Sequence, residues 1–355
     1  MNRIIYILCL TVFLFKNLII SKNASERCKI LALEGGGEKG AYQAGVLKAF
    51  VENLPPEEIQ YDIYSGISVG SLNSAALSFF KKGDEKNASD FLLKTWRNIS
   101  SYKDVYQNYN SLGVFYSFFF ERGIYDTTPL KNLITDIIMS HNVSRNFTFG
   151  MSNLESGQFE IFTDLHLKNL SKKDEILAIL SSSAMPSLFP PIIFKNKTYV
   201  DGGLFTMVDL TSGISICRNF GFTDENIIID IVMLDNNTIP YDNNNLTTVY
   251  SGLRAVDIIY KEIFNRNLDE IAHIFPNVKI RYLVIPSAKL SSGPFPINFI
   301  PEELENMIQL GIKDAINVIN KGEGTVFNEV RDQYLETKYK RYFVRPKAKG
   351  FLSLS

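Results

Sequence analysis

The chain has 355 residues, of which 45% are hydrophobic, and its 37 basic and 38 acidic residues give a net charge of -1 at pH 7. A chain of this length can bury a sizeable core, and the lack of a basic excess argues against a nucleic-acid-binding protein. We therefore expect a globular protein with no nucleic acid among its partners.

The N-terminus has the pattern of a secretory signal peptide. Arg3 precedes an apolar run from Ile4 to Phe15, and polar residues follow from Ser21 to Arg27. The apolar run is shorter than the about 20 residues that a membrane-spanning helix needs. We predict a cleaved signal peptide over residues 1–22; a retained anchor and a buried first helix are the alternatives.

Two further features agree with passage through the secretory pathway. Loss of Cys9 with the signal peptide leaves Cys28 and Cys217, which permits one disulfide but not a disulfide scaffold. The chain also contains sequons for N-glycosylation, although an Asn-rich chain generates such triplets by chance. We expect a secreted or luminal glycoprotein of the endoplasmic reticulum or endolysosomal system. The sequons begin at Asn23, Asn87, Asn98, Asn142, Asn146, Asn169, Asn196, Asn236 and Asn245.

The globular part begins with a strand, a glycine-rich loop and a helix. Residues 28–33, "CKILAL", read as a buried strand, and residues 41–51 have the apolar spacing of a helix. No long linker or internal repeat follows, and apolar runs alternate with helical patterns, which is typical of an α/β protein with a mostly parallel sheet. The loop between this first strand and helix contains Gly35, Gly36, Gly37 and Gly40.

This glycine loop has two interpretations. The spacing Gly35-x-Gly37-x-x-Gly40 fits a dinucleotide-binding fingerprint, which wants an acidic residue about 20 residues further on, at the end of the second strand. Glu57 and Glu58 are the nearest candidates, but they precede that strand. An oxyanion site explains the loop better, because glycine amides ahead of a helix can donate hydrogen bonds to a tetrahedral intermediate.

A second strand-loop-helix junction follows over residues 61–77. It contains Gly66-Ile67-Ser68-Val69-Gly70, the Gly-x-Ser-x-Gly pattern of a nucleophile elbow. Glycines two residues before and after Ser68 remove the Cβ atoms that would collide in so sharp a turn. The amide end of the following helix favours negative charge beside the serine. We predict Ser68 as a nucleophile.

An aromatic segment over residues 111–125, "SLGVFYSFFFERGIY", comes next. It places four phenylalanines and two tyrosines within 11 residues. Packing in the core is the expected role, and a lid or wall of an acyl-chain pocket is the alternative.

A serine nucleophile needs a base, and histidine is the usual one. The three histidines are His141, His166 and His273, and none of them lies at a strand end beside glycine or an acidic residue. His273 could formally complete a Ser-Asp-His order, but surface or packing roles fit all three better.

Asp201 is the better candidate for the base. The segment "FKNKTYVDGGLF", residues 194–205, reads as an apolar hairpin that carries Asp201 to a strand end before Gly202 and Gly203. A carboxylate there can accept the serine proton if proton transfer accompanies nucleophilic attack. On this motif alone, an aspartate in a turn before glycines would be the better interpretation. Three motifs together in one chain favour the catalytic one.

Taken together, these motifs resemble the patatin-like phospholipase family. The resemblance covers residues 29–209 and rests on "GGGEKG", "GISVG" and "VDGG", with "SSAMPSLFPP" before the last of them. It implies a three-layer α/β/α fold and a Ser-Asp dyad, Ser68 with Asp201, that cleaves acyl esters of phospholipids, lysophospholipids or related glycerolipids. Glu34, in place of the family's frequent aspartate, and "LFTMVDLTSG" after the motif are departures.

The resemblance also implies which groups stabilise the oxyanion. They come from the glycine loop, where Lys39 occupies the family's basic position, and from the residue after the nucleophile. The implied set is Gly35, Gly36, Gly37, Lys39, Gly40 and Val69, with Gly66, Gly70, Gly202 and Gly203 as motif glycines.

The rest of the chain, residues 210–355, reads as a C-terminal extension of the catalytic region over residues 29–209. Strands are expected within "ENIIIDIVML" and "VKIRYLVIP", and helices over residues 249–273 and 301–321, which would extend the same sheet. We expect a lipid substrate at a membrane or micelle surface, with no cofactor, metal or obligate protein partner. A catalytically silent lipid-binding relative and a dinucleotide-dependent oxidoreductase are the alternatives.

Overall fold

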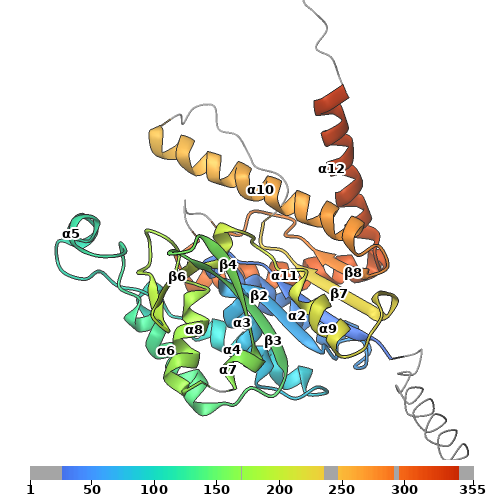
Figure 1. Ribbon diagram of the computed structural model, residues 1–355, viewed down its shortest axis with the longest axis horizontal. Helices are drawn as coiled ribbons and strands as arrows, with labels where there is room; N and C mark the ends of the chain where they lie inside the picture. Colours follow the sequence, from blue (N-terminus) through green and yellow to red (C-terminus); the bar gives the residue numbers. More distant parts are fainter. Residues whose placement is uncertain (1–25, 169, 236–246, 292–295, 344–355) are drawn as a thin grey trace, which may run out of the picture.

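The structure is a computed structural model that describes residues 26–168, 170–235, 247–291 and 296–343 (Figure 1). The predicted signal peptide over residues 1–22 lies outside the described residues. Of the sequons, those at Asn23, Asn169, Asn236 and Asn245 also lie outside them. Within the described ranges, no helix combines the length and apolar character needed to cross a membrane.

An eight-stranded sheet forms the centre of the molecule, in the order β5-β6-β3-β2-β1-β7-β8, with β4 also paired to β3. Strands β8, β7, β1, β2 and β3 are parallel, whereas β4, β5 and β6 join antiparallel. The predicted, mostly parallel α/β sheet is confirmed. The strands are β1 (Cys28–Leu33), β2 (Ile63–Ile67), β3 (Asn146–Asn153), β4 (Gln158–Thr163), β5 (Ile192–Phe194), β6 (Lys197–Asp201), β7 (Ile227–Val232) and β8 (Lys279–Val284).

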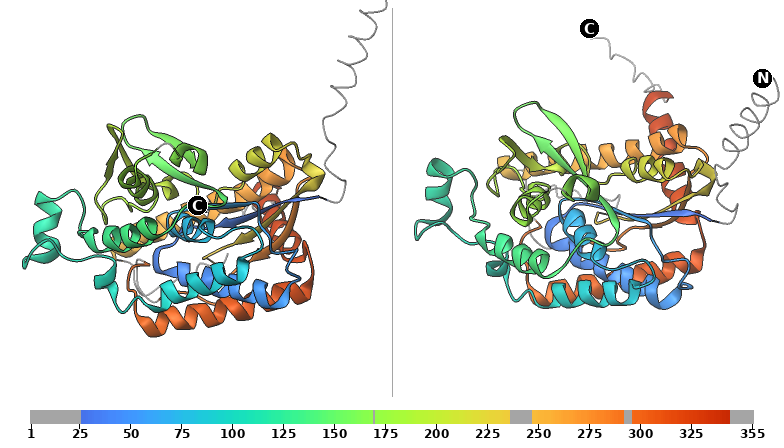
Figure 2. Two further views of the ribbon diagram at one scale, coloured as in Figure 1. Left: turned by 90° about the horizontal axis from the view of Figure 1, so that it is seen from below. Right: turned by 60° about the horizontal axis from the view of Figure 1, so that its bottom comes forward.

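Helices cover both faces of the sheet and give three layers (Figure 2). α2, α3, α4 and α11 pack on one face, while α9, α12 and the C-terminal part of α10 pack on the other. The helices are α2 (Gly40–Asn53), α3 (Val69–Ser78), α4 (Glu85–Arg97), α5 (Gly113–Phe120), α6 (Thr128–Ser140), α7 (Asp164–Leu167), α8 (Lys172–Ser181), α9 (Ser212–Asn219), α10 (Thr248–Ile274), α11 (Pro301–Lys321) and α12 (Thr325–Phe343). Short 3-10 helices are η1 (Gly37–Lys39), η2 (Tyr102–Asp104), η3 (Gly202–Leu204) and η4 (Asp224–Asn226).

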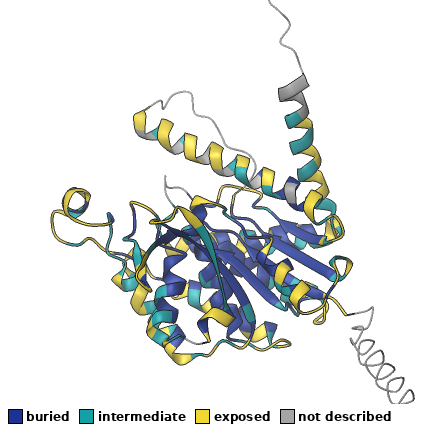
Figure 3. Ribbon diagram, in the orientation of Figure 1, coloured by how far each residue is buried: buried dark blue, intermediate teal, exposed yellow. Residues whose placement is uncertain are grey.

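Strand β1 is almost continuously apolar because it is buried on both faces of the sheet. Leu31 and Leu33 belong to the core on the α2 side, whereas Cys28, Ile30 and Ala32 belong to the core on the α9 side. Helices cover both faces of this parallel sheet and exclude water from them. Successive residues of the strand point to opposite faces, so the buried residues on both must be apolar. The strands accordingly form the buried centre of the molecule (Figure 3).

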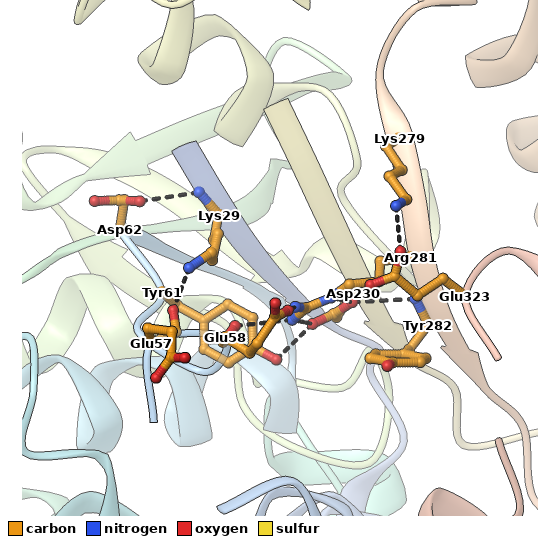
Figure 4. A network of polar contacts seen from close by, with 10 residues as sticks. All are labelled: Lys29, Glu57, Glu58, Tyr61, Asp62, Asp230, Lys279, Arg281, Tyr282 and Glu323. Carbon is orange, nitrogen blue, oxygen red and sulfur yellow. Dashed lines mark hydrogen bonds and ion pairs between the residues drawn. The ribbon is translucent and has the colours of Figure 1, made fainter. Parts of the chain in front are cut away.

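A buried ionic network ties the strands together toward the amino ends of β1 and β2 (Figure 4). Asp230 of β7 accepts hydrogen bonds from the hydroxyl of Tyr61 at 2.6 Å and from Nε of Arg281 at 3.0 Å. Arg281, on β8, also forms an ion pair with Glu58. Charges removed from water in this way require such pairing, so the network fixes β7, β8 and the entry to β2 relative to each other.

The segment after residue 209 contributes to the same sheet. β7 pairs with β1 through all six residues of each strand, and β8 pairs with β7. The expected helix over residues 301–321 matches α11, which packs on α2. The glycine loop after β1 therefore lies between β2, from the first half of the chain, and β7, from the second.

The phenylalanines of the aromatic segment over residues 111–125 do not pack in the core, whereas Tyr125 at its end is partly buried against it. Phe115, Phe118, Phe119 and Phe120 of α5 are all more than 60% exposed. The prediction of core packing was wrong for these side chains. An apolar run shows that the side chains avoid water, but it does not show whether they pack against protein or lie on the surface. Figure 1 shows α5 standing away from the body of the protein.

Cys28 and Cys217 form a disulfide that joins β1 to α9. Both residues are fully buried, and the bridge connects positions 189 residues apart. Such a cross-link restricts the unfolded chain, so its loss is expected to lower the free energy of unfolding by about 2–5 kcal/mol. Urea unfolding with and without a thiol reductant measures this loss. The double variant Cys28→Ala, Cys217→Ala should not respond to the reductant, and equal stability of the oxidised and reduced protein would contradict the prediction.

Candidate active site

Ser68 occupies the sharp turn between β2 and α3 that the sequence predicts. Its backbone has φ 54° and ψ -124°, a conformation that residues with a side chain rarely adopt. The N–H of Ser68 donates a hydrogen bond to Oγ of Ser182 at 3.1 Å, and Ser182 in turn donates to the carbonyl of Gly150 at 2.6 Å. These bonds help hold the strained turn, with Ser68 at the N-terminus of α3.

The glycines on either side of Ser68 are required by close backbone contacts. A Cβ atom at Gly66 would lie 2.1 Å from the carbonyl oxygen of Gly70. One at Gly70 would lie 2.3 Å from the carbonyl oxygen of Leu33, at the end of β1. Both distances are far below van der Waals contact, so only glycine allows β1, β2 and the start of α3 to meet here.

Asp201 lies at the end of β6, where the hairpin β5–β6 delivers it to the same end of the sheet as Ser68. Its side chain is buried, and Oδ1 accepts a hydrogen bond from the N–H of Gly203 at 2.7 Å. Gly202 is needed for the approach, since a Cβ there would lie 2.4 Å from the carbonyl oxygen of Gly150. The aspartate therefore has a fixed position beside β3 and β2.

The environment of Asp201 suits a base. Burial raises the pKa of its carboxyl group to about 6, against the opposing effects of the nearby Ser68 hydroxyl and of the N–H of Gly203. Its second oxygen, Oδ2, is buried and accepts no hydrogen bond of standard geometry from the described residues. The Ser68 side chain lies near enough to lower the pKa of this carboxyl group, and a carboxylate with a raised pKa is a stronger proton acceptor.

The three histidines are engaged elsewhere. His141 stacks on Phe79, with ring centroids 5.1 Å apart, at the end of α6. His166 lies within hydrogen-bond distance of Thr163, and His273 is 2.7 Å from the backbone carbonyl of Asp269. No contact joins any of them to Ser68 or Asp201 in the part of the chain that the structure describes.

The glycine loop provides fewer donors than the sequence suggests. The N–H of Gly35 donates to the carbonyl of Met207 at 2.8 Å, and that of Lys39 donates to the carbonyl of Gly36 at 3.2 Å. The N–H of Gly40 is also satisfied within η1, and the ammonium of Lys39 pairs with Asp235 at 2.7 Å. These three residues of the predicted oxyanion set are therefore occupied by local structure.

The remaining members of that set are free to act on a ligand. Among the described residues, the N–H groups of Gly36, Gly37 and Val69 have no hydrogen-bond partner. Gly37, Ser68 and Val69 also line one pocket. Gly35 lies against Ser68, because a Cβ built on it would be 3.0 Å from the Cβ of Ser68.

Two buried glutamates anchor the glycine loop to later parts of the chain. Glu34 accepts hydrogen bonds from the N–H groups of Leu234 and Asp235, just after β7. Burial and the nearby Asp235 raise the pKa of Glu34 to about 8, against these hydrogen bonds and Lys39. Glu38 accepts hydrogen bonds from Ser291 and Phe299, and the N–H of Glu38 donates to the carbonyl of Pro296 at 2.9 Å.

An apolar pocket leads away from Ser68. It has an empty volume of about 880 Å³, which includes space open to solvent. Helices α3, α4 and α6 supply most of the wall, and Phe299 and Phe189 close it near the loops. The lining from α6 alone is Leu130, Leu133, Ile134, Ile137 and Ile138. An aliphatic chain is the ligand that such a surface suits.

The contacts of the buried polar residues that support this site were not predicted from the sequence. Ser182, Glu34 and Glu38 are polar yet buried, and each makes its contact far along the chain. Ser182 lies in "SSSAMPS", a run whose serines gave no indication of their partners. Phe299 reaches the pocket from a loop before α11 without any motif.

The chain is similar in sequence to one protein family and to two individual proteins. The family model for patatin-like phospholipase matches residues 31–214, just over half of the chain. Uncharacterized protein L620 of Acanthamoeba polyphaga mimivirus is 33% identical over 153 residues, which are 41% of this chain and 37% of that protein. A cGAMP-activated phospholipase of Escherichia coli (strain TW11681) is 23% identical over 359 residues, 92% of this chain and 95% of that one.

Among solved structures, VipD from Legionella pneumophila aligns with a TM-score of 0.42 and 11% identity, over 84% of this chain and 68% of VipD. The family match spans both the glycine loop and Asp201, the two ends of the site described above. The chain belongs to the patatin-like phospholipase family, a family of lipid acyl hydrolases.

Proposed function

We propose that the protein hydrolyses acyl ester bonds of phospholipids, lysophospholipids or related glycerolipids with Ser68 as nucleophile and Asp201 as base. The observation that carries the proposal is the position of an elbow serine beside a buried carboxylate at the mouth of an apolar pocket. The family match and the phospholipase relative support a lipid ester as substrate.

In the first half of the reaction, Oγ of Ser68 attacks the ester carbonyl carbon while its proton passes to the Asp201 carboxylate. The N–H groups of Gly36 and Gly37 donate hydrogen bonds to the oxyanion, and the N-terminus of α3 adds a favourable dipole. Breakdown of the tetrahedral intermediate releases the alcohol, which takes the proton from Asp201. Water, activated by the same carboxylate, then hydrolyses the acyl-enzyme.

The pocket supports the lipid part of this proposal. Binding an acyl chain between α3, α4 and α6 removes apolar surface from water on both the chain and the protein. The ester carbonyl then lies at the pocket mouth, beside Ser68 and Gly37. The test is release of fatty acid from phosphatidylcholine, lysophosphatidylcholine and triacylglycerol by the purified protein. Equal release by the Ser68→Ala variant would refute the proposal.

The raised pKa of Asp201 predicts a pH profile. The base must be ionised to accept the serine proton, so kcat/KM should level off above about pH 7, be half-maximal near the pKa of about 6, and fall about tenfold per pH unit well below it. Hydrolysis of a water-soluble ester between pH 4.5 and 8.5 measures the profile. Glu34→Gln keeps a hydrogen-bond acceptor for Leu234 and should leave the inflection in place. A profile that stays flat down to pH 5 contradicts the assignment.

We propose that the enzyme acts in the secretory pathway or outside the cell. The Cys28–Cys217 disulfide supports an oxidising compartment, and the sequon residues Asn87, Asn98, Asn142 and Asn196 are exposed to solvent. Expression in a eukaryotic cell tests this. The mature N-terminus should begin after about residue 20, and endoglycosidase treatment should lower the mass. Secretory-pathway protein that retains Met1 would contradict cleavage.

A further inference from the structure

The excursion over residues 107–126 leaves the body of the protein at the wall of the acyl pocket. Backbone hydrogen bonds pair Gln107 with Asp126 in both directions, at 3.0 and 2.9 Å, and close the excursion at its base. Val105, just before it, and Leu130, just after it, both line the pocket. Whatever binds the tip of the excursion is therefore held next to the pocket.

The segment that returns from α5 to the body of the protein is also fixed to the pocket wall. The N–H groups of Ile124 and Tyr125 donate to the carbonyl oxygens of Ser187 and Leu188, each at 2.9 Å. The next residue, Phe189, lines the pocket. The stem is thus a built part of the site, while α5 at the tip stands away from the body (Figures 1 and 2).

Helix α5 presents aromatic side chains to solvent around its circumference. The rings contact one another, with centroids 5.5 Å apart for Phe115 and Phe119 and 5.2 Å for Phe118 and Phe119. Ser117 is the residue of this helix that is buried. Apolar clusters of this kind on a protein surface mark interaction sites. The most exposed side chains are Phe115 (74%), Phe118 (73%), Phe120 (72%), Leu112 (67%) and Phe119 (62%).

Charge and length indicate what this cluster binds. No charged residue occurs from Val105 to Phe120, whereas Lys103 and Asp104 precede this stretch and Glu121 and Arg122 follow it. Uncharged aromatic tips bounded by charges suit the boundary between lipid headgroups and acyl chains, where aromatic residues are enriched. α5 has eight residues. At 1.5 Å per residue it is about 12 Å long, far short of the roughly 30 Å core of a bilayer.

We propose that α5 inserts its phenylalanines into the surface of a lipid bilayer and docks the mouth of the acyl pocket on the membrane. This inference rests on the proposed function, because a lipid substrate resides in that bilayer. Docking lets an acyl chain pass from the membrane into the pocket with little exposure to water. No sequon falls between Asn98 and Asn142, so no N-linked glycan is expected on the excursion itself.

Binding to phosphatidylcholine vesicles tests the proposal directly. The parent protein carries Ser68→Ala, so that the vesicles stay intact, and its partition is measured by flotation. Replacing Phe115, Phe118, Phe119 and Phe120 by serine should weaken the partition by about tenfold or more, because each ring loses apolar contact with the acyl chains. The matched control changes two exposed apolar side chains outside the excursion, Leu165→Ser and Ile274→Ser, and should bind like the parent.

Two results would overturn the proposal. One is unchanged vesicle binding by the quadruple variant. The other is a parent protein that self-associates through α5, seen as a dimer that becomes monomeric in the quadruple variant while vesicle partition stays the same. In that case a second copy of the chain covers the phenylalanines.

A second assay separates this inference from the proposed function. With Ser68 restored, the quadruple variant should hydrolyse a short water-soluble ester within about twofold of the parent, because α5 does not line the pocket. Its hydrolysis of phospholipid in vesicles should fall with the loss of binding. If no form hydrolyses either substrate, the proposed function fails, and the flotation result still decides whether α5 binds membranes.

Discussion

Ser68→Ala is expected to lower kcat by about 10⁴-fold or more, because no other group can form the acyl-enzyme. Asp201→Asn is expected to lower kcat by about 10²- to 10⁴-fold, since it removes the base. Its fold should survive, because the amide oxygen of Asn can accept the hydrogen bond that Gly203 donates to Oδ1. The melting temperature should not drop at pH 8, where the buried carboxylate of Asp201 would otherwise be ionised.

The histidines provide the control for this prediction. His141, His166 and His273 contact other groups, so replacing all three should leave most of the activity on a soluble ester. Circular dichroism establishes that each variant is folded before its kcat is compared. A folded triple variant without activity would overturn the dyad in favour of a histidine-dependent triad.

Gly37→Ala should lower kcat by about 10²- to 10³-fold, with little change in KM, as expected when an oxyanion donor is displaced. Gly37 has φ 57°, and a Cβ on it would lie 2.1 Å from the carbonyl oxygen of Pro296. The loop must therefore move, and the N–H of Gly37 moves with it. Steady-state kinetics on a soluble ester separates kcat from KM.

Alanine substitutions at two other glycines serve as controls for the effect of Gly37→Ala. Gly83 also has a positive φ, 99°, but a Cβ there would meet no atom within 4 Å, so Gly83→Ala should cost only about 1 kcal/mol of stability and leave kcat unchanged. At Gly36 a Cβ would meet the end of the Leu234 side chain at 2.9 Å, which can shift, so Gly36→Ala should have a smaller effect than Gly37→Ala. An unchanged kcat in Gly37→Ala would contradict the oxyanion assignment.

Local sequence determined the elements around the site. The run over residues 28–33 matches β1, and the Gly-x-Ser-x-Gly pattern falls on the turn from β2 to α3. Small residues were a reliable signal there, because strands meeting so closely leave no room for a Cβ. The Asp-Gly-Gly segment likewise falls at the end of β6.

Contacts between distant segments could not be predicted in this way. Nothing around Glu38 indicates that Ser291 and Phe299 will donate to it, since neither belongs to a motif. Lys39 was expected to help stabilise the oxyanion, but its ammonium group forms an ion pair with Asp235. The prediction for the aromatic segment over residues 111–125 failed for a different reason. An apolar side chain looks the same in the sequence whether it packs inside the protein or lies exposed on its surface.

The anchoring of the glycine loop has a consequence for how the enzyme becomes active during its synthesis. Ser68 and Asp201 leave the ribosome early, whereas Ser291, Pro296 and Phe299, which hold the loop, emerge about 100 residues after Asp201. At 5–20 residues per second, this interval lasts roughly 5 to 20 seconds. We expect a nascent chain to carry its nucleophile through this period without a formed oxyanion site, so that lipids near the translating ribosome are not attacked before the protein is complete.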